Sequence, residues 1–158
     1  MKCRKCNHKA VINMHQHKLA LCKEHILDWV CEQTEGNIKK YKLFSENDRV
    51  LVAVSGGKDT LALWDVLNKL KYKTGGLYIN LGIVTENGYS EKSQLLTENF
   101  AQQRNLPLHI VNVKTEYGKT IPEFSETTKR GKSKPCSICG LVIILPKFLC
   151  ILAQFAAN

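Results

Sequence analysis

The pattern of apolar and polar positions predicts three strands and three helices. Short apolar runs at 49–54, 76–81 and 108–113 predict strands, the first of them buried on both faces as in a parallel sheet. Helical periodicity covers 23–44 and 58–70, where Leu63, Leu67 and Leu70 form an apolar stripe, and a third helix runs from a cap at Ser90 to about residue 104. This order and spacing predict an α/β fold with a parallel sheet.

The ends of the chain differ in character from this alternating part. Residues 1–25 are basic and rich in Cys and His, and residues 114–135 predict a loop-rich polar segment. The last residues are apolar and nearly uncharged, but Pro146, Lys147 and Gln154 interrupt them, so no membrane span is expected. An exposed apolar tail beside an open sheet edge would favour aggregation. The polar N-terminal residues do not resemble a signal peptide, which predicts a cytoplasmic protein.

Composition narrows the class of protein. The chain has 158 residues, of which 44% are hydrophobic, and this excludes a disordered or collagen-like chain. It carries 23 Lys and Arg against 14 Asp and Glu, a net charge of +9, which favours a polyanionic partner such as nucleic acid. There are seven cysteines, four of them in Cys-x2-Cys pairs. Without a secretory signal, they indicate metal or redox chemistry in a reducing compartment.

The N-terminal segment carries a metal-ligand pattern, Cys3-x2-Cys6-x15-Cys22-x2-His25. Each short pair can hold one edge of a tetrahedral ion, and three thiolates with one imidazole suit Zn²⁺. A segment this short cannot bury a core of its own, so the metal would supply its folding energy. His8, His15 and His17 are expected to be exposed to solvent. Cys31, on the following helix, is expected in the protein core. The sequence therefore predicts a zinc finger over residues 1–25.

A glycine turn follows the first predicted strand, in the stretch Val52-Ala53-Val54-Ser55-Gly56-Gly57-Lys58-Asp59-Thr60. Glycines allow backbone N–H groups to approach an anion, and the helix that follows adds unpaired N–H donors. The spacing does not match a Walker A loop, and Ala53 replaces the first glycine of a nucleophile elbow. The turn is therefore predicted to hold phosphate.

Ser-Gly-Gly-Lys-Asp-Thr after a buried strand resembles the signature of the PP-loop ATP pyrophosphatases. The N-terminal finger and the segments 61–67, 77–83 and 135–141 extend this resemblance to the tRNA 2-thiolation branch, the TtuA-type tRNA sulfurtransferases. The resemblance implies a Rossmann-like sheet and an enzyme that adenylates O2 of a tRNA uridine with ATP and Mg²⁺, after which sulfur displaces AMP. It also implies an ATP site formed by Ala53, Ser55, Gly56, Gly57, Lys58, Asp59, Thr60 and Ile79, with the backbone of the last against adenine.

The second cysteine pair, Cys136-x2-Cys139, leaves three interpretations open: half of a zinc site, a redox dithiol, or two ligands of an iron–sulfur cluster. The resemblance implies the last, a [4Fe–4S] cluster whose third cysteine ligand is missing here. A cluster held by three protein ligands leaves one iron open for sulfur. Cys150 lies in an apolar run, which favours a core position or randomly translated sequence over a third cluster ligand. The basic residues before the pair (Lys129, Arg130, Lys132 and Lys134) form either a solvated face or a phosphate contact.

The resemblance ends after about residue 142. Ile143 stands where the family has a catalytic lysine, so the chain is expected to be a truncated or frameshifted member. The expected parts are a zinc finger (1–25), a linking helix (26–48), an incomplete PP-loop domain (49–142) and an apolar tail (143–158). Expected partners are tRNA and a sulfur-donor protein or sulfide, with a homodimer left open. Three functions compete: tRNA thiolation, a non-catalytic zinc- and nucleotide-binding remnant, or an unrelated iron–sulfur or redox protein.

Overall fold

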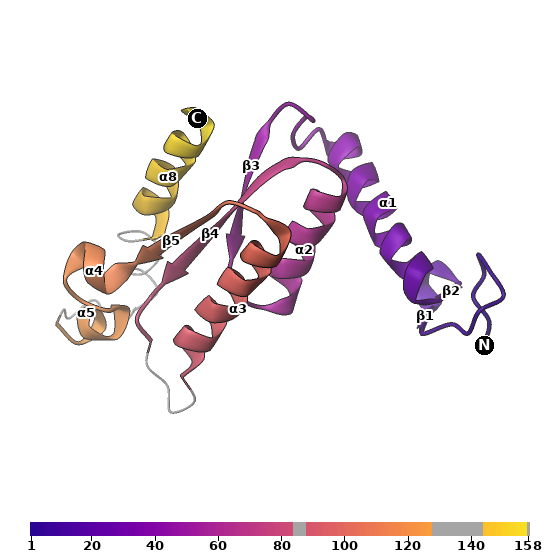
Figure 1. Cartoon of the computed structure of the whole chain (residues 1–158), viewed down its shortest axis with the longest axis horizontal. Helices are drawn as coiled ribbons and strands as arrows, with labels where there is room; N and C mark the ends of the chain where they lie inside the picture. The colour runs from indigo at the N-terminus through magenta and orange to yellow at the C-terminus, as the bar shows by residue number, and fades with distance from the viewer. Residues whose placement is uncertain (84–87, 128–143, 158) are drawn as a thin grey trace.

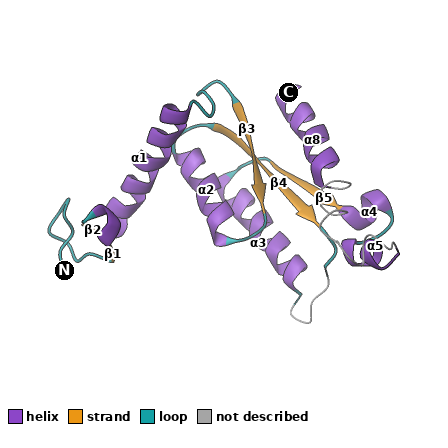
Figure 2. Cartoon of the chain, turned by 180° about the vertical axis from the view of Figure 1, so that it is seen from behind, coloured by secondary structure: helices purple, strands orange, loops and turns teal. Residues whose placement is uncertain are grey.

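The computed structural model of the chain describes residues 1–83, 88–127 and 144–157. Its centre is a parallel sheet of β3 (Arg49–Val54), β4 (Lys73–Asn80) and β5 (Leu108–Asn112), in the order β3-β4-β5. Helices α2 (Lys58–Lys69) and α3 (Tyr89–Arg104) cover one face, and α8 (Leu145–Ala157) lies on the other (Figures 1 and 2). The predicted α/β fold with a parallel sheet is confirmed.

The main core lies between the sheet and the α2–α3 layer. Both crossovers run in the same direction along the sheet, in the order β3-β4-β5, so crossovers of the usual right hand place both helices on this face. Trp64 is completely buried on α2, and its indole N–H donates to the Thr74 hydroxyl at 3.1 Å. The predicted stripe is wrong at Leu63, which is 47% exposed, because Trp64 takes the sheet-facing position beside Leu67. The first strand is not buried on both faces throughout either, since Ala53 is exposed near its end.

Strand β4 begins three residues before the predicted strand, and its two glycines lie inside it. A Cβ on Gly76 would collide with the Trp64 ring, and one on Gly75 would lie 2.6 Å from Phe155 Cε2. The glycines therefore do not interrupt the strand. They allow aromatic rings from the two helix layers to reach the sheet from opposite sides.

Two short helices replace part of the predicted loop at 114–135: α4 (Val113–Tyr117) and α5 (Ile121–Thr127). The Asn112 side chain caps α4 by accepting a hydrogen bond from the Thr115 N–H at 3.2 Å. Before α5, the Thr120 N–H donates to Glu123 at 2.6 Å, as in a capping box. Pro122 fits within the first turn of α5, where a missing N–H costs nothing.

The apolar tail is not an exposed segment, because it forms α8 and packs on the sheet. Ile151 is buried with Leu77 and Val111, and Phe155 is buried beneath the Arg49 guanidinium, whose Cζ lies 4.5 Å from the ring centroid. Leu149 and Leu152 point to solvent. None of the described helices is long and apolar enough to span a bilayer.

Shortening Ile151 tests this packing. The substitution Ile151→Ala should lower the free energy of unfolding by about 2 kcal/mol, the lower range for removing a buried aliphatic side chain. Leu152→Ala, one residue further on the exposed side of the same helix, should change it by less than about 0.5 kcal/mol. Urea denaturation followed by circular dichroism measures both. Equal effects would contradict the packing of α8 on the sheet.

The N-terminal residues form a separate small unit at the far end of α1 (Lys23–Tyr41), away from the sheet (Figure 1). It contains an antiparallel pair, β1 (Ile12–Met14) and β2 (Leu19–Leu21), joined by the 3-10 turn η1 (His15–His17). Helix α1 connects this unit to the main core, where Ile38 is buried. The predicted helix therefore exists, and it ends three residues early, at Tyr41.

Candidate functional site

The glycine turn joins β3 to α2 at the carboxyl edge of the sheet. Gly56 has φ +74°, a left-handed conformation that strains any residue with a side chain. A Cβ there would also collide with the Ser93 backbone, lying 2.8 Å from its Cα. Gly57 has ordinary dihedral angles and precedes the first residue of α2, Lys58. The turn is therefore shaped by Gly56 and pressed against α3.

Thr60 holds the turn in this conformation. Its hydroxyl donates to the Gly57 carbonyl at 3.0 Å, and the Ser55 N–H points to the same hydroxyl at 3.4 Å. The first bond of the helix joins the Leu61 N–H to the Gly57 carbonyl at 3.2 Å, so the N–H groups before it have no helical partner. Ser55, Lys58 and Asp59 are exposed around this helix N-terminus. The arrangement suits an anion.

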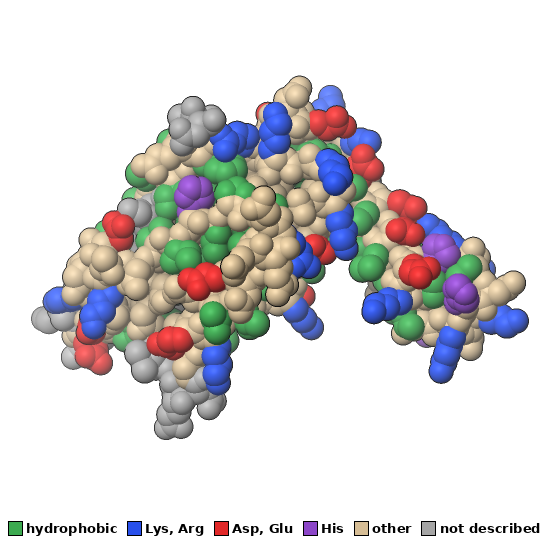
Figure 3. Space-filling view, viewed as in Figure 1, with side chains coloured by type: hydrophobic (Ala, Val, Ile, Leu, Met, Phe, Trp, Pro, Cys, Tyr) green, Lys and Arg blue, Asp and Glu red, His purple; other side chains and the backbone are tan. Residues whose placement is uncertain are grey.

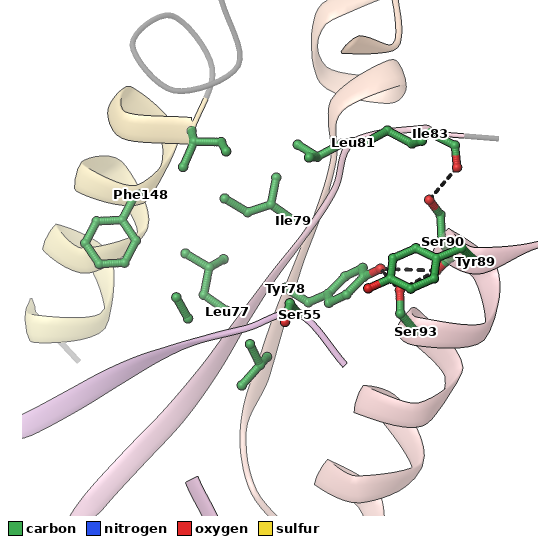
Figure 4. Close-up of a pocket in the computed structure, with 13 residues that line it drawn as sticks. Ser55, Leu77, Tyr78, Ile79, Leu81, Ile83, Tyr89, Ser90, Ser93 and Phe148 are labelled. Carbon is green, nitrogen blue, oxygen red and sulfur yellow. Dashed lines mark hydrogen bonds between the residues drawn. The ribbon is translucent and has the colours of Figure 1, made fainter. Parts of the chain in front are cut away.

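A cavity of about 320 Å³ opens beside the turn, over the carboxyl ends of β3 and β4 (Figure 4). One side presents hydroxyls, those of Ser55, Tyr78, Ser90 and Ser93. The other side is apolar, with residues in or directly beside β4 and α8: Leu77, Ile79, Leu81, Ile144 and Phe148. Of the eight residues expected in the ATP site, Ala53, Ser55 and Ile79 line this cavity, and the other five form the adjoining turn and first helical turn.

Strand β4 continues past the end of β3. Its pairing with β3 ends at Val54 and Tyr78, whereas its pairing with β5 continues to Asn80 and Asn112. In the described residues, the edge of Ile79 and Asn80 that faces β3 therefore has no strand partner. Backbone donors and acceptors on this edge border the cavity, at the place where parallel sheets commonly bind ligands.

Sequence reasoning missed the part that α3 takes in the site. Gly88 precedes the helix, which begins at Tyr89, so Ser90 is not the cap. Its hydroxyl instead donates to the Ile83 carbonyl at 2.6 Å, and the Tyr78 hydroxyl lies 2.7 Å from that of Ser93. The signal in the sequence was a helical repeat of small residues, and the structure buries all of them: Ser90, Ser93, Thr97 and Ala101. Small side chains allow α3 to approach the glycine turn.

The four predicted zinc ligands converge at the N-terminal unit. Their ligand atoms all lie within 4.8 Å of one another. Cys6 Sγ is 3.7 Å from Cys22 Sγ, and His25 Nδ1 is 3.2 Å from Cys22 Sγ and 3.4 Å from Cys3 Sγ. Zinc–ligand bonds of about 2.3 Å to sulfur and 2.1 Å to nitrogen in a tetrahedron require edges of about 3.8 Å and 3.6 Å. The four residues therefore fit Zn²⁺.

The pKa of the Cys3 thiol is lowered, which favours the thiolate form. Burial opposes ionisation of Cys3, but backbone N–H groups of Cys22, Lys5 and Cys6 outweigh it and lower the pKa of the thiol to about 6. A thiolate is the form that binds a metal ion. His8 and Glu24 also lie near Cys22, but both are exposed. His8, His15 and His17 are all exposed, as expected.

Comparison with known protein families identifies the family of the domain that contains this turn and cavity. The model of the PP-loop domain matches residues 19–131, well over half of the chain. The chain belongs to the PP-loop family. A second model, the N-terminal LIM domain of 2-thiouridine synthetase TtuA, matches residues 2–25, the segment that holds the cysteine cluster.

The relatives of this PP-loop chain include several tRNA-modifying enzymes. It is 46% identical over 141 residues to a tRNA-5-methyluridine(54) 2-sulfurtransferase of Thermus thermophilus, covering 89% of this chain and 42% of the relative. A Pyrococcus horikoshii protein of the same name is 42% identical, with 94% and 46% covered. Among solved structures, the U34-tRNA thiolase NcsA from Methanococcus maripaludis with its [4Fe-4S] cluster matches with a TM-score of 0.69 at 25% identity, covering 90% and 46%. The chain thus spans less than half the length of these relatives.

Some expected site residues of the PP-loop chain lie outside the described residues. These are Cys136, Cys139, Ile143 and the basic residues Lys129, Arg130, Lys132 and Lys134. Of the remaining cysteines, Cys31 is half-buried on α1 instead of in the core. Cys150 is exposed on α8, so its expected core position is wrong.

Proposed function

We propose that this chain takes part in ATP-dependent 2-thiolation of a tRNA uridine. In this reaction the uridine O2 attacks the α-phosphorus of ATP and pyrophosphate leaves. Sulfur from a donor protein or sulfide then attacks C2, and AMP departs with the former O2. The observation that carries the proposal is the left-handed Gly56 turn at a helix N-terminus, open to a cavity at the carboxyl edge of the sheet. The names of the sulfurtransferase relatives supply the substrate class.

The residues of the turn have distinct roles in this proposal. Backbone N–H groups of the turn and of the first turn of α2 bind the phosphates of ATP with Mg²⁺, because helix N-termini favour anions. Lys58 adds a positive charge, and Thr60 keeps the turn in shape. Ile79 pairs with Val111 of β5, but among the described residues its side toward β3 has no strand partner, which supports an adenine contact through the main chain.

The zinc site has a structural role in the proposal. Cys3, Cys6, Cys22 and His25 hold the ion, which fixes the two strands of the finger and the start of α1. The solved structure of NcsA contains a [4Fe–4S] cluster. For this chain, a cluster held by Cys136 and Cys139 remains a prediction.

The finger also has a strongly basic composition. Between residues 1 and 25 it carries six Lys and Arg (Lys2, Arg4, Lys5, Lys9, Lys18 and Lys23) and a single acidic residue, Glu24. Figure 3 shows blue side chains projecting around this end of the molecule, at the right. Positive charge at this density supports contact with the tRNA phosphates.

A second candidate function is nucleotide and zinc binding without thiolation by this chain alone. The observation that favours it is Ile143, which stands where the family resemblance implies a catalytic lysine. The two candidates differ in turnover. Thiolation requires AMP, pyrophosphate and 2-thiouridine in equal amounts when tRNA and sulfide are present, whereas the binding function gives ATP affinity without products.

Calorimetric titration of ATP with Mg²⁺ tests the nucleotide site that both functions share. We expect the chain to bind ATP, and Gly57→Val to weaken binding at least about tenfold, since a branched side chain would fill the approach to the turn. The matched control is Gly36→Val on α1, where a Cβ meets no atom within 4 Å. Lack of ATP binding, or equal affinity in Gly57→Val, would contradict the proposal. Mass spectrometry of tRNA nucleosides after reaction then locates any 2-thiouridine.

A further inference from the structure

Helix α8 supplies one wall of the cavity beside the glycine turn. Phe148, in the first turn of α8, lies across this space from Leu77 and Ile79 of β4 (Figure 4), and Ile144, directly before α8, also lines it. Phe148 is half-buried and packs with the cluster that contains Leu77. The wall therefore comes from the apolar tail, the part of the chain for which the sequence indicates no function.

The two sides of the cavity suit different parts of one ligand. A molecule with its phosphates on the glycine turn extends its remaining part past Ser55 into the cavity, because turn and cavity adjoin. A planar heteroaromatic base has apolar faces and a polar edge. Ile79 and Phe148 offer apolar surface for the faces, and the unpaired edge of β4 beyond Tyr78 offers backbone donors and acceptors for the polar edge.

We propose that Phe148, together with Ile144, forms the base-binding wall of the nucleotide site and holds the purine of ATP against β4 beside Ile79. This rests on the proposed function, in which the glycine turn binds the phosphates of ATP. In single-stranded nucleic-acid complexes, alanine substitution of an aromatic residue that stacks on a base weakens binding by about fivefold or more. Phe148 therefore contributes to affinity for the base and not to affinity for the phosphates, and the packing of α8 on the sheet completes the pocket.

Calorimetric titrations of the full chain with ATP and with inorganic pyrophosphate, both with Mg²⁺, separate these contributions. We expect Phe148→Ala to weaken ATP binding about tenfold and to change pyrophosphate binding less than about twofold. Phe148→Leu should give an intermediate loss, since it keeps apolar surface but no ring. The control is Leu149→Ala, the neighbouring residue of α8, which is 54% exposed and should leave both affinities unchanged.

Tryptophan at the same position gives a measurement that does not depend on affinity. In Phe148→Trp, AMP should change the emission of the new indole, and pyrophosphate should not. Thermal melts without ligand show whether each variant keeps its fold. Unchanged ATP affinity in Phe148→Ala, or equal losses for ATP and pyrophosphate, would overturn the base-wall role. If the unaltered chain binds neither ligand, the proposed nucleotide site itself fails.

Discussion

Cys22→Ser is expected to remove the metal from the finger and to unfold residues 1–25. The buried cluster of this unit consists of Cys3, Leu21 and Cys22, so little apolar surface replaces the lost metal. Structural zinc in small fingers contributes about 10–16 kcal/mol of apparent binding free energy, which is also folding free energy. Zinc measured by atomic emission should fall from about one ion per chain to near zero. The emission of Trp29, which packs against the cluster, should shift to the red.

The control for this prediction is Cys31→Ser. Cys31 lies on α1 and is half-buried, but it does not belong to the group of close ligand atoms. Its substitution should leave zinc content unchanged. If Cys22→Ser retains a full equivalent of zinc, or if the unaltered chain holds well below one, the assigned ligand set is wrong. Loss of zinc in both variants would instead indicate a different set that includes Cys31.

Gly56→Ala should strongly destabilise the PP-loop domain. The left-handed backbone costs about 1–2 kcal/mol for a residue with a side chain. The collision of the Cβ with the Ser93 backbone adds an overpacking cost of about 1–3 kcal/mol. The free energy of unfolding should therefore fall by about 2–5 kcal/mol. ATP binding should weaken in the protein that remains folded, because the turn must move away from α3.

Gly118→Ala separates the two costs. Gly118 has φ +76°, nearly that of Gly56, but a Cβ there meets no atom within 4 Å. Its substitution should therefore cost about 1–2 kcal/mol, from backbone strain alone. Urea denaturation of both variants gives the difference. Equal costs would mean that the close approach of α3 to the turn is not rigid in solution.

Local patterns in the sequence were sufficient for most elements of the fold. Apolar runs gave the three parallel strands, and β3 has the predicted bounds, Arg49–Val54. The spacing of Cys3, Cys6, Cys22 and His25 predicted a group that the structure brings together. Ligand spacing is local information, because two short pairs can close on one ion whatever surrounds them. The Ser-Gly-Gly turn could also be predicted locally, since glycine adopts the left-handed backbone conformation at residue 56 without strain.

Errors arose where contacts between distant segments decide the outcome. Periodicity could not show that Trp64, and not Leu63, faces the sheet, because Gly76 opens the space for its ring. The buried stripe of α3 is made of small residues, which an apolar repeat does not reveal. The capping box Thr120–Glu123 is a local signal for a helix start, but the polar composition of 114–135 led to the prediction of a loop.

The sequence by itself determined the fold class, the zinc-ligand pattern and the glycine turn between β3 and α2, because each depends on residues close together in the chain. Only the tertiary structure decided what the apolar tail does. Composition predicted an exposed segment, whereas Ile151 and Phe155 are buried on the sheet and Phe148 reaches the cavity. The physical reason is that burial of an apolar helix depends on a complementary surface elsewhere. Here Leu77 and Val111, more than thirty residues before α8, provide that surface.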